Sequence, residues 1–123
     1  MNCIFCEIAN NNIPSYTIYE DEIVRAFLDI HPDSNGHTLI VPKKHFLDIS
    51  DIDNETLIHI MDVTRKIKEL LEDVLKIDGL SLIQNNGIAQ EIKHYHLHLK
   101  PHYKDHNELL KAEEIFHLLN KKI

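Results

Sequence analysis

The chain has 123 residues, 43% of them hydrophobic, and a formal net charge of −7 from 20 acidic and 13 basic side chains. This length is typical of one globular domain with its own core, and the negative charge disfavours nonspecific binding to nucleic acid or to an anionic membrane. No apolar run approaches the about 20 residues that a membrane-spanning helix needs. The N-terminus lacks the basic and apolar segments of a secretory signal, so we expect a cytoplasmic location.

The first third of the chain predicts one short helix or turn and three strands. Residues 3–10 form the helix or turn, and the strands cover Tyr16–Tyr19, Ile23–Ile30 and His37–Val41. An acidic turn at residues 20–22 separates the first two strands, and a run of turn-forming residues separates the second from the third. We therefore expect a hairpin followed by a third strand.

Residues 54–76 show the clearest helical period of the chain. Asp53 or Asn54 is suited to cap the N-terminus of this helix, and Gly79 follows its end. At about 1.5 Å per residue, the helix is roughly 33 Å long and can cover a sheet of several strands. The side chains expected on its buried stripe are Leu57, Ile60, Met61, Thr64, Ile67, Leu71, Val74 and Leu75.

Two further strands and a last helix complete the expected fold. The strands cover Leu80–Gln84 and His94–Lys100, and the helix covers residues 107–119. This order of elements predicts an α+β fold, in which one long helix covers a five-stranded, mostly antiparallel sheet and a C-terminal helix is added. We expect residues 1–123 to form a single domain.

Three histidines alternate with apolar or aromatic residues in the run His94-Tyr95-His96-Leu97-His98-Leu99. Side chains of a strand alternate between its two faces, so the three imidazoles should share one face while their neighbours anchor the strand in a core. An imidazole can be a nucleophile, a proton shuttle or a metal ligand. The alternative is a polar strand face without a function.

The two cysteines, Cys3 and Cys6, form a CxxC motif. A structural disulfide is unexpected in a reducing cytosol, which leaves zinc binding, redox chemistry or plain unmetallated cysteines. A thioredoxin-like redox motif would follow a strand, and the chain has no room for one before Cys3. Zinc would need two more ligands, for which histidine is plentiful.

The segment Asn85–Lys93 leads directly into the histidine run. Its Asn-Asn-Gly start favours a left-handed turn. Such a turn can point backbone amides inward and bind an anion, although the segment can equally be an ordinary connection between two strands.

The alternating histidines are one of several motifs that occur in the order of a known family. The others are Cys3-Ile-Phe-Cys6, Ile13-Pro14-Ser15, Tyr19-Glu20-Asp21-Glu22, Ala26-Phe27-Leu28-Asp29-Ile30, Gly36-His37-Thr38-Leu39, Val41-Pro42-Lys43-Lys44-His45 and Gln84-Asn85-Asn86-Gly87. Together they resemble the histidine triad (HIT) family, in its bacterial type with a CxxC zinc motif, and imply the HIT fold. The resemblance covers about residues 3–101 and leaves residues 102–123 as a helical tail.

The resemblance implies a nucleotide hydrolase or transferase that acts on a nucleoside phosphoramidate or a dinucleoside polyphosphate. His96 matches the family nucleophile, which attacks the α-phosphorus and forms a nucleotidyl-histidine that water cleaves. The attacking nitrogen must be unprotonated, so the other ring nitrogen should donate to a nearby acceptor. His98 and His37 match residues that contact the phosphate, and Asn85 matches one near the ribose and the leaving group.

The resemblance also implies how a purine nucleotide, such as an AMP derivative, is bound. Asp29 matches the acid that accepts hydrogen bonds from the ribose hydroxyls, and Gln90 and Asn85 are further expected nucleotide contacts. For two members of the implied apolar slot, Ile8 and Ile13, core packing explains the residue type equally well. The apolar slot for the base consists of Phe5, Ile8, Ile13 and Ile30.

The implied cofactor is one structural zinc ion, and no organic cofactor is expected. By the resemblance, the zinc ligands are Cys3, Cys6, His45 and His94. A homodimer is implied as well. Two alternatives remain: a nucleotide-binding or scaffold protein with little turnover, and a zinc hydrolase in which the three alternating histidines bind the metal directly, although their spacing along one strand is too long for that.

The chain departs from the family pattern at three places. The segment between Asn85 and His94 is about two residues shorter than usual. Glu91 stands where some relatives carry a serine that assists the leaving group, and a carboxylate there would repel phosphates unless it were protonated or turned outward. Lys100 takes a position that is usually apolar, and we expect it at the sheet edge or with its ammonium reaching solvent.

Overall fold

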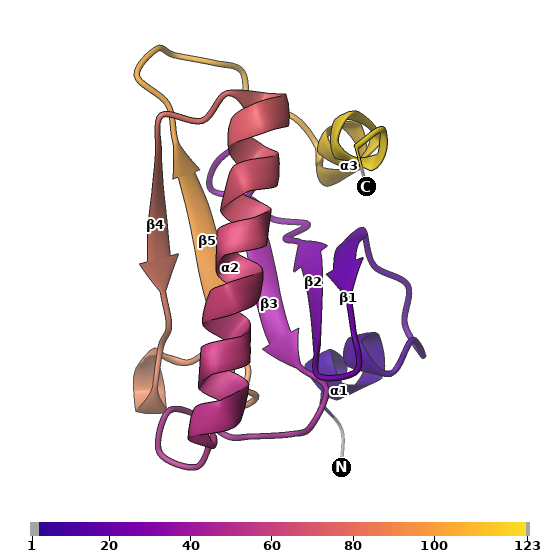
Figure 1. Ribbon diagram of the computed structural model, residues 1–123, viewed down its shortest axis with the longest axis vertical. Helices are drawn as coiled ribbons and strands as arrows, with labels where there is room; N and C mark the ends of the chain where they lie inside the picture. Colours follow the sequence, from indigo (N-terminus) through magenta and orange to yellow (C-terminus); the bar gives the residue numbers. More distant parts are fainter. Residues whose placement is uncertain (1–2, 123) are drawn as a thin grey trace.

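The computed structural model describes residues 3–122 (Figure 1). Its elements in chain order are α1 (Ile4–Ala9), β1 (Thr17–Glu20), β2 (Val24–Leu28), β3 (Thr38–Pro42), α2 (Asn54–Leu75), β4 (Gly79–Ile83), the 3₁₀ turn η1 (Gly87–Ala89), β5 (Leu97–His102) and α3 (Ala112–Asn120). Among the described residues, no helix is both long and apolar enough to cross a membrane.

The five strands form one sheet with the order β1-β2-β3-β5-β4, and all neighbours are antiparallel. Helix α2 crosses one face of this sheet, and α1 lies behind the opposite face (Figure 1). The predicted α+β fold, with five strands, one long helix and a C-terminal helix, is therefore confirmed. The strand order places β5 inside the sheet, so Lys100 is not at the sheet edge, contrary to one of the expectations.

The main core lies between the sheet and α2. Tyr95, Leu97 and Leu99 belong to it, as the alternating pattern predicted. Four of the expected stripe residues of α2 are buried, namely Ile60, Thr64, Ile67 and Leu71. Leu57, Val74 and Leu75 are only partly buried against this core, and Met61 is exposed while Val63 is buried in its place. Helix α3 closes one end of this core with Ala112, Ile115 and Leu119.

A second, smaller core fills the space between α1 and the opposite face of the sheet. Phe5 and Ile8 of α1 pack there against alternate side chains of β2 and β3, which are Phe27, Leu39 and Val41. Because residues of a strand alternate between faces, β2 and β3 supply both cores at once. The smaller core sets the position of α1 beside the histidine-bearing face.

Most element boundaries differ from the prediction by one or two residues, and those of β5, α2 and α3 have a structural explanation. Strand β5 is paired only from Leu97, although the nitrogen of Tyr95 still donates to the carbonyl of Phe46 at 2.7 Å. The long helix ends at Lys76, which takes the left-handed conformation with φ 55°, so Gly79 is not its cap.

Helix α3 begins at Ala112 rather than near residue 107. The side chain of buried Asn35 makes hydrogen bonds to the backbone of the segment before the helix, and these keep that segment out of the helix. The Asn35 Nδ2 donates to the carbonyl of Glu108 at 2.8 Å, and its Oδ1 accepts from the nitrogen of Leu110 at 2.7 Å.

Candidate active site and metal cluster

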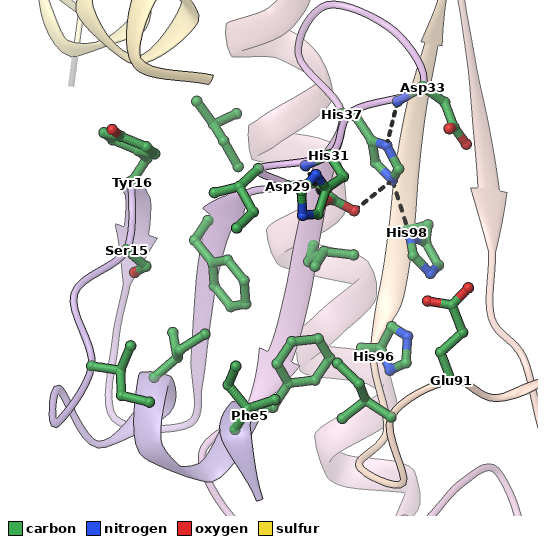
Figure 2. Close-up of a pocket in the computed structure, with 18 of the residues that line it drawn as sticks. Phe5, Ser15, Tyr16, Asp29, His31, Asp33, His37, Glu91, His96 and His98 are labelled. Atoms are coloured by element: carbon green, nitrogen blue, oxygen red, sulfur yellow. Dashed lines mark hydrogen bonds and ion pairs between the residues drawn. The ribbon is translucent and has the colours of Figure 1, made fainter. Parts of the chain in front are cut away.

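A cleft of about 600 Å³ opens on the face of the sheet opposite α2. One end is apolar and is lined by Phe5, Ile8, Ile13, Phe27 and Leu39. The other end carries three histidines, His37, His96 and His98 (Figure 2). The cleft therefore joins an apolar slot to a cluster of imidazoles, which suits a ligand with a flat apolar part and a polar reacting part.

His96 is 4% exposed, and its Nδ1 lies 2.8 Å from the carbonyl oxygen of His94. A carbonyl only accepts hydrogen bonds, so the Nδ1 of the neutral ring carries the proton and its Nε2 keeps a lone pair. Burial lowers the pKa of His96, against the hydrogen bond to His94 and the charges of Glu91 and Asp29, which raise it. The Phe5 ring packs edge-on against this imidazole with centroids 5.0 Å apart. Position and protonation both suit a nucleophile.

His37 and His98 form a hydrogen-bonded pair of imidazoles beside His96. The backbone nitrogen of Asp33 donates to the Nδ1 of His37 at 3.0 Å, so the proton of the neutral His37 ring lies on Nε2. This Nε2 is 3.0 Å from the Nδ1 of His98 and donates to it, which leaves the His98 proton on its own Nε2. Burial and the neighbouring His96 and His37 lower the pKa of His98 to about 4. His98 is thus a neutral imidazole that can donate a hydrogen bond from Nε2.

Asp29 follows β2 directly and lines the middle of the cleft. Its Oδ1 accepts from the backbone nitrogen of His31 at 2.8 Å, and its Oδ2 lies 3.6 Å from the Nε2 of His37. The adjacent Ile30 lines the rim with 67% of its surface exposed. The carboxylate thus lies between the apolar slot and the imidazoles.

The loop between β4 and β5 contributes Asn85 and Glu91 to the cleft. Gly87 takes the left-handed conformation expected for the Asn-Asn-Gly turn, with φ 62°. Gln90 is not brought to the cleft: it is buried, and its Nε2 donates to the carbonyl of Leu47 at 2.7 Å. A contact between Gln90 and a nucleotide therefore gains no support from this geometry.

Sequence reasoning missed Asp33 as a residue of this site and did not place Lys100 in it. The Lys100 Nζ pairs with the Oδ2 of Asp33 at 2.6 Å, and both residues line the cleft. The alternation of β5 could have placed Lys100 on the same face as His98. Nothing in the sequence indicated that the Asp33 loop folds back over this strand.

A second cluster lies at the start of α1 and consists of Cys3, Cys6, His45 and His94, whose ligand atoms all lie within 4.8 Å of one another. The Nε2 of His94 lies 2.8 Å from the carbonyl of Pro42 and donates to it, so the Nδ1 keeps its lone pair. This Nδ1 is 3.4 Å from each of the two sulfur atoms and 3.1 Å from the Nδ1 of His45.

These distances and donors fit a tetrahedral zinc site. With ordinary Zn–S and Zn–N bond lengths, a tetrahedron sets S···N separations near ~3.5 Å and N···N separations near ~3.3 Å. Burial and the neighbouring Cys3 raise the pKa of Cys6 to about 11, so its thiol keeps its proton unless a cation stabilises the thiolate. Both cysteines are unpaired, as expected for metal ligands.

The three alternating histidines therefore do not converge on one ion. His94 belongs to the cysteine cluster, while His96 and His98 line the cleft. Asp29, His37 and His98 form a further group within 4.8 Å. The His37 Nδ1 accepts a hydrogen bond from the backbone nitrogen of Asp33. The Nε2 of the neutral His37 ring therefore carries the proton and has no lone pair for a metal.

Comparisons with known sequences show which proteins this chain is similar to. The model of the HIT domain family matches residues 10–105. An uncharacterised HIT-like protein of Methanocaldococcus jannaschii is 42% identical over 115 residues, which cover 92% of this chain and 88% of that protein. The adenosine 5′-monophosphoramidase HNT1 of Saccharomyces cerevisiae is 42% identical over 101 residues, which cover 80% of this chain and 61% of the yeast protein.

Solved structures of histidine triad proteins are also similar to this chain. A zinc-bound histidine triad family protein of Mycobacterium smegmatis superposes with a TM-score of 0.88 at 34% identity, covering 98% of this chain and 92% of its own. A hypothetical histidine triad nucleotide-binding protein of Sulfolobus tokodaii superposes with a TM-score of 0.86 at 35% identity, covering 97% and 87%. The similarity thus extends over nearly the whole chain.

Proposed function

Because the chain belongs to the HIT family, we propose that it is a nucleotide hydrolase or transferase that forms a covalent nucleotidyl intermediate on His96. Its substrate is a nucleoside phosphoramidate or a dinucleoside polyphosphate. One observation carries this proposal: the hydrogen bond from the His96 Nδ1 to the His94 carbonyl leaves the Nε2 lone pair available at the cleft. A neutral imidazole is a competent nucleophile near neutral pH.

A purine nucleotide, such as an AMP derivative, occupies the cleft from its apolar end to its imidazole end. Its base lies in the slot of Phe5, Ile8, Ile13 and Ile30. The ribose hydroxyls donate to Asp29, whose carboxylate has acceptor capacity for both. Asn85 lies on the side where the leaving group departs. In this orientation the α-phosphate lies beside His96, His98 and His37.

In the first step, the Nε2 lone pair of His96 attacks the α-phosphorus. A P–N bond to His96 forms while the bond to the leaving nitrogen or oxygen breaks, and the leaving atom keeps both electrons and takes a proton from solvent if it is an amine. His96 becomes cationic, and its Nδ1–H donates more strongly to the His94 carbonyl than in the neutral state. The Nε2–H of His98 donates to the phosphate oxygens as charge develops there.

In the second step, water attacks the phosphorus and the bond to His96 breaks. The electrons of that bond return to Nε2, which restores the neutral imidazole, and the water proton passes to solvent. Across both steps one water is consumed, its hydroxyl ends on phosphorus, and one proton ends on the leaving amine. The polar end of the cleft supplies each group that the chemistry needs from this chain.

The phosphoramidate branch has the more direct support. The yeast relative is named an adenosine 5′-monophosphoramidase and shares 42% identity with this chain. Most of the other similar curated proteins carry only the name HIT-like protein, so they do not separate the two branches.

The proposed cofactor is one zinc ion held by Cys3, Cys6, His45 and His94. A closed site of two thiolates and two imidazoles supplies a structural cross-link and no open position for catalysis. The cross-link would join the start of α1 to the segment that carries His96. The homodimer and the cytoplasmic location remain predictions.

Intact-protein mass spectrometry tests the nucleophile. The wild type and His96→Ala are mixed briefly with an AMP phosphoramidate or with diadenosine tetraphosphate and measured without acid. We expect an AMP-sized adduct on the wild type only, while AMP still binds to both proteins. If neither substrate gave an adduct or a product while AMP bound, the chain would be a nucleotide-binding protein with little turnover. If His96→Ala retained full activity, the nucleophile would be another residue.

A further inference from the structure

Glu91 lies in the loop just before β5 and lines the cleft together with His96 and Asn85. Figure 2 shows its side chain rising from this loop, with the carboxylate pointing toward the end of the cleft that carries His96 and His98. The carboxylate therefore faces the reacting end of the site, while the residue stays exposed to solvent at the mouth of the cleft.

The cleft contains more negative than positive charge. Three carboxylates line it, those of Asp29, Asp33 and Glu91, against the single ammonium of Lys100. The Lys100 ammonium is already paired, because its Nζ lies 2.6 Å from the Oδ2 of Asp33. The imidazoles add no compensating charge, since burial keeps the pKa values of His37 and His98 below their usual range.

The Glu91 carboxylate has no polar partner in the described part of the chain. Within residues 3–122, no ion pair or hydrogen bond joins its carboxylate to another side chain. The cation nearest in sequence, Lys93, donates from Nζ to the carbonyl of Gly87 at 2.6 Å. A carboxylate without a partner attracts a cationic ligand group and repels an anionic one.

We propose that Glu91 determines leaving-group specificity, and that the preferred substrate is a nucleoside monophosphate joined through a P–N bond to an amine that carries a further positive charge, such as a diamine. The inference rests on the proposed function and narrows it. A dinucleoside polyphosphate is disfavoured, because its additional phosphates bring negative charge beside Glu91.

Glu91 acts in this proposal through its charge and transfers no proton. The P–N bond of the substrate breaks with both electrons going to nitrogen, which takes a proton from solvent, and the amine departs with its second cation intact. The net charge of −7 on the chain adds to the preference, because it slows the approach of polyanions relative to less negative substrates.

The test compares four adenosine substrates that share AMP and differ in the leaving group. Three are phosphoramidates of 1,3-diaminopropane, propylamine and β-alanine, whose free ends are cationic, neutral and anionic, and the fourth is diadenosine tetraphosphate. The kcat/KM of each is measured for the wild type, for Glu91→Gln and for Glu69→Gln. Glu69 is an exposed acid on α2, across the sheet from the cleft, so its variant loses the same charge elsewhere.

We expect the wild type to prefer the cationic over the anionic phosphoramidate, and Glu91→Gln to reduce this ratio of kcat/KM values about tenfold. Glu69→Gln should keep the wild-type ratio. Raising the salt from about 50 mM to about 500 mM should shrink the ratio in the wild type but not in Glu91→Gln, because an electrostatic preference is screened.

Two outcomes would overturn the proposal while leaving the proposed function intact: the same ratio in the wild type and Glu91→Gln, or faster turnover of diadenosine tetraphosphate than of the cationic phosphoramidate. Absence of turnover with all four substrates would instead remove the proposed function itself.

Discussion

The Nδ1 of His96 lies 2.8 Å from the carbonyl oxygen of His94, while the Nδ1 of the His94 side chain points into the cysteine cluster. One residue therefore serves both sites: its side chain belongs to the cluster and its backbone fixes the protonation of the proposed nucleophile. A change in the cluster should consequently reach the reacting end of the cleft through only two residues of chain.

Loss of the cysteine cluster should reduce both metal content and stability. We expect Cys6→Ser to lose the bound zinc and to lower the free energy of unfolding by about 4 kcal/mol or more, because a missing structural metal is among the most damaging single changes. Metal analysis and urea unfolding check this, with the exposed His106→Asn as a control that keeps both values. If the wild type contained no zinc and Cys6→Ser were as stable as the wild type, the four side chains would pack together without a metal.

Replacement of His98 should slow the reaction far more than it weakens binding. His98→Asn loses the Nε2–H donor proposed for the phosphate oxygens, so kcat should fall about 10²-fold while KM changes by only a few-fold. The matched control is His102→Asn, four residues further along β5, whose Nε2 lies 2.6 Å from the Oγ of Ser81 outside the cleft. Equal effects of the two changes would contradict a role for His98 at the phosphate.

The fold should lose stability in mild acid. Burial lowers the pKa of His98 to about 4 and lowers that of His37, whereas an unfolded histidine titrates near ~6.5. Between these values the unfolded chain binds more protons than the folded chain, so the free energy of unfolding falls as the pH falls from about 6.5 towards 4.

Urea unfolding at a series of pH values measures this decline, to which each such histidine contributes at most about 1.4 kcal/mol per pH unit. His98→Asn should flatten the decline, and His106→Asn should not, because the side chain of His106 is exposed. An unchanged pH dependence in His98→Asn would mean that other groups govern acid stability.

Asp29 should make binding depend on the ribose hydroxyls. We expect the wild type to bind AMP about 10-fold to 100-fold more tightly than 2′,3′-dideoxy-AMP, because hydrogen bonds to a charged group are worth roughly 1.5–3 kcal/mol. Asp29→Ala should bind the two ligands with similar affinity, as measured by calorimetry. If the variant weakened both ligands equally, Asp29 would act on the loop that carries His31 and not on the ribose.

Much of the site could be predicted from short motifs, because their residues are close in sequence. The pattern around His96 and His98 predicted which side chains share a face, and Tyr95, Leu97 and Leu99 do enter the main core. Gln90 and Lys100 show where this approach ends. The direction of Gln90 depends on the carbonyl of Leu47, and that of Lys100 on Asp33, residues 43 and 67 positions away.

The sequence by itself determined the two-faced histidine strand, the long helix and the CxxC pair, because each is a local pattern with a fixed period or spacing. Only the tertiary structure decided the strand order, the meeting of Cys3 with His94 over 91 positions, and the proton positions on the imidazoles. Those proton positions follow from acceptors and donors such as the carbonyl of Pro42 and the nitrogen of Asp33, which packing brings to the rings. Side-chain direction along a strand is a local property, whereas a hydrogen-bond partner is set by whatever the fold places within about 3 Å.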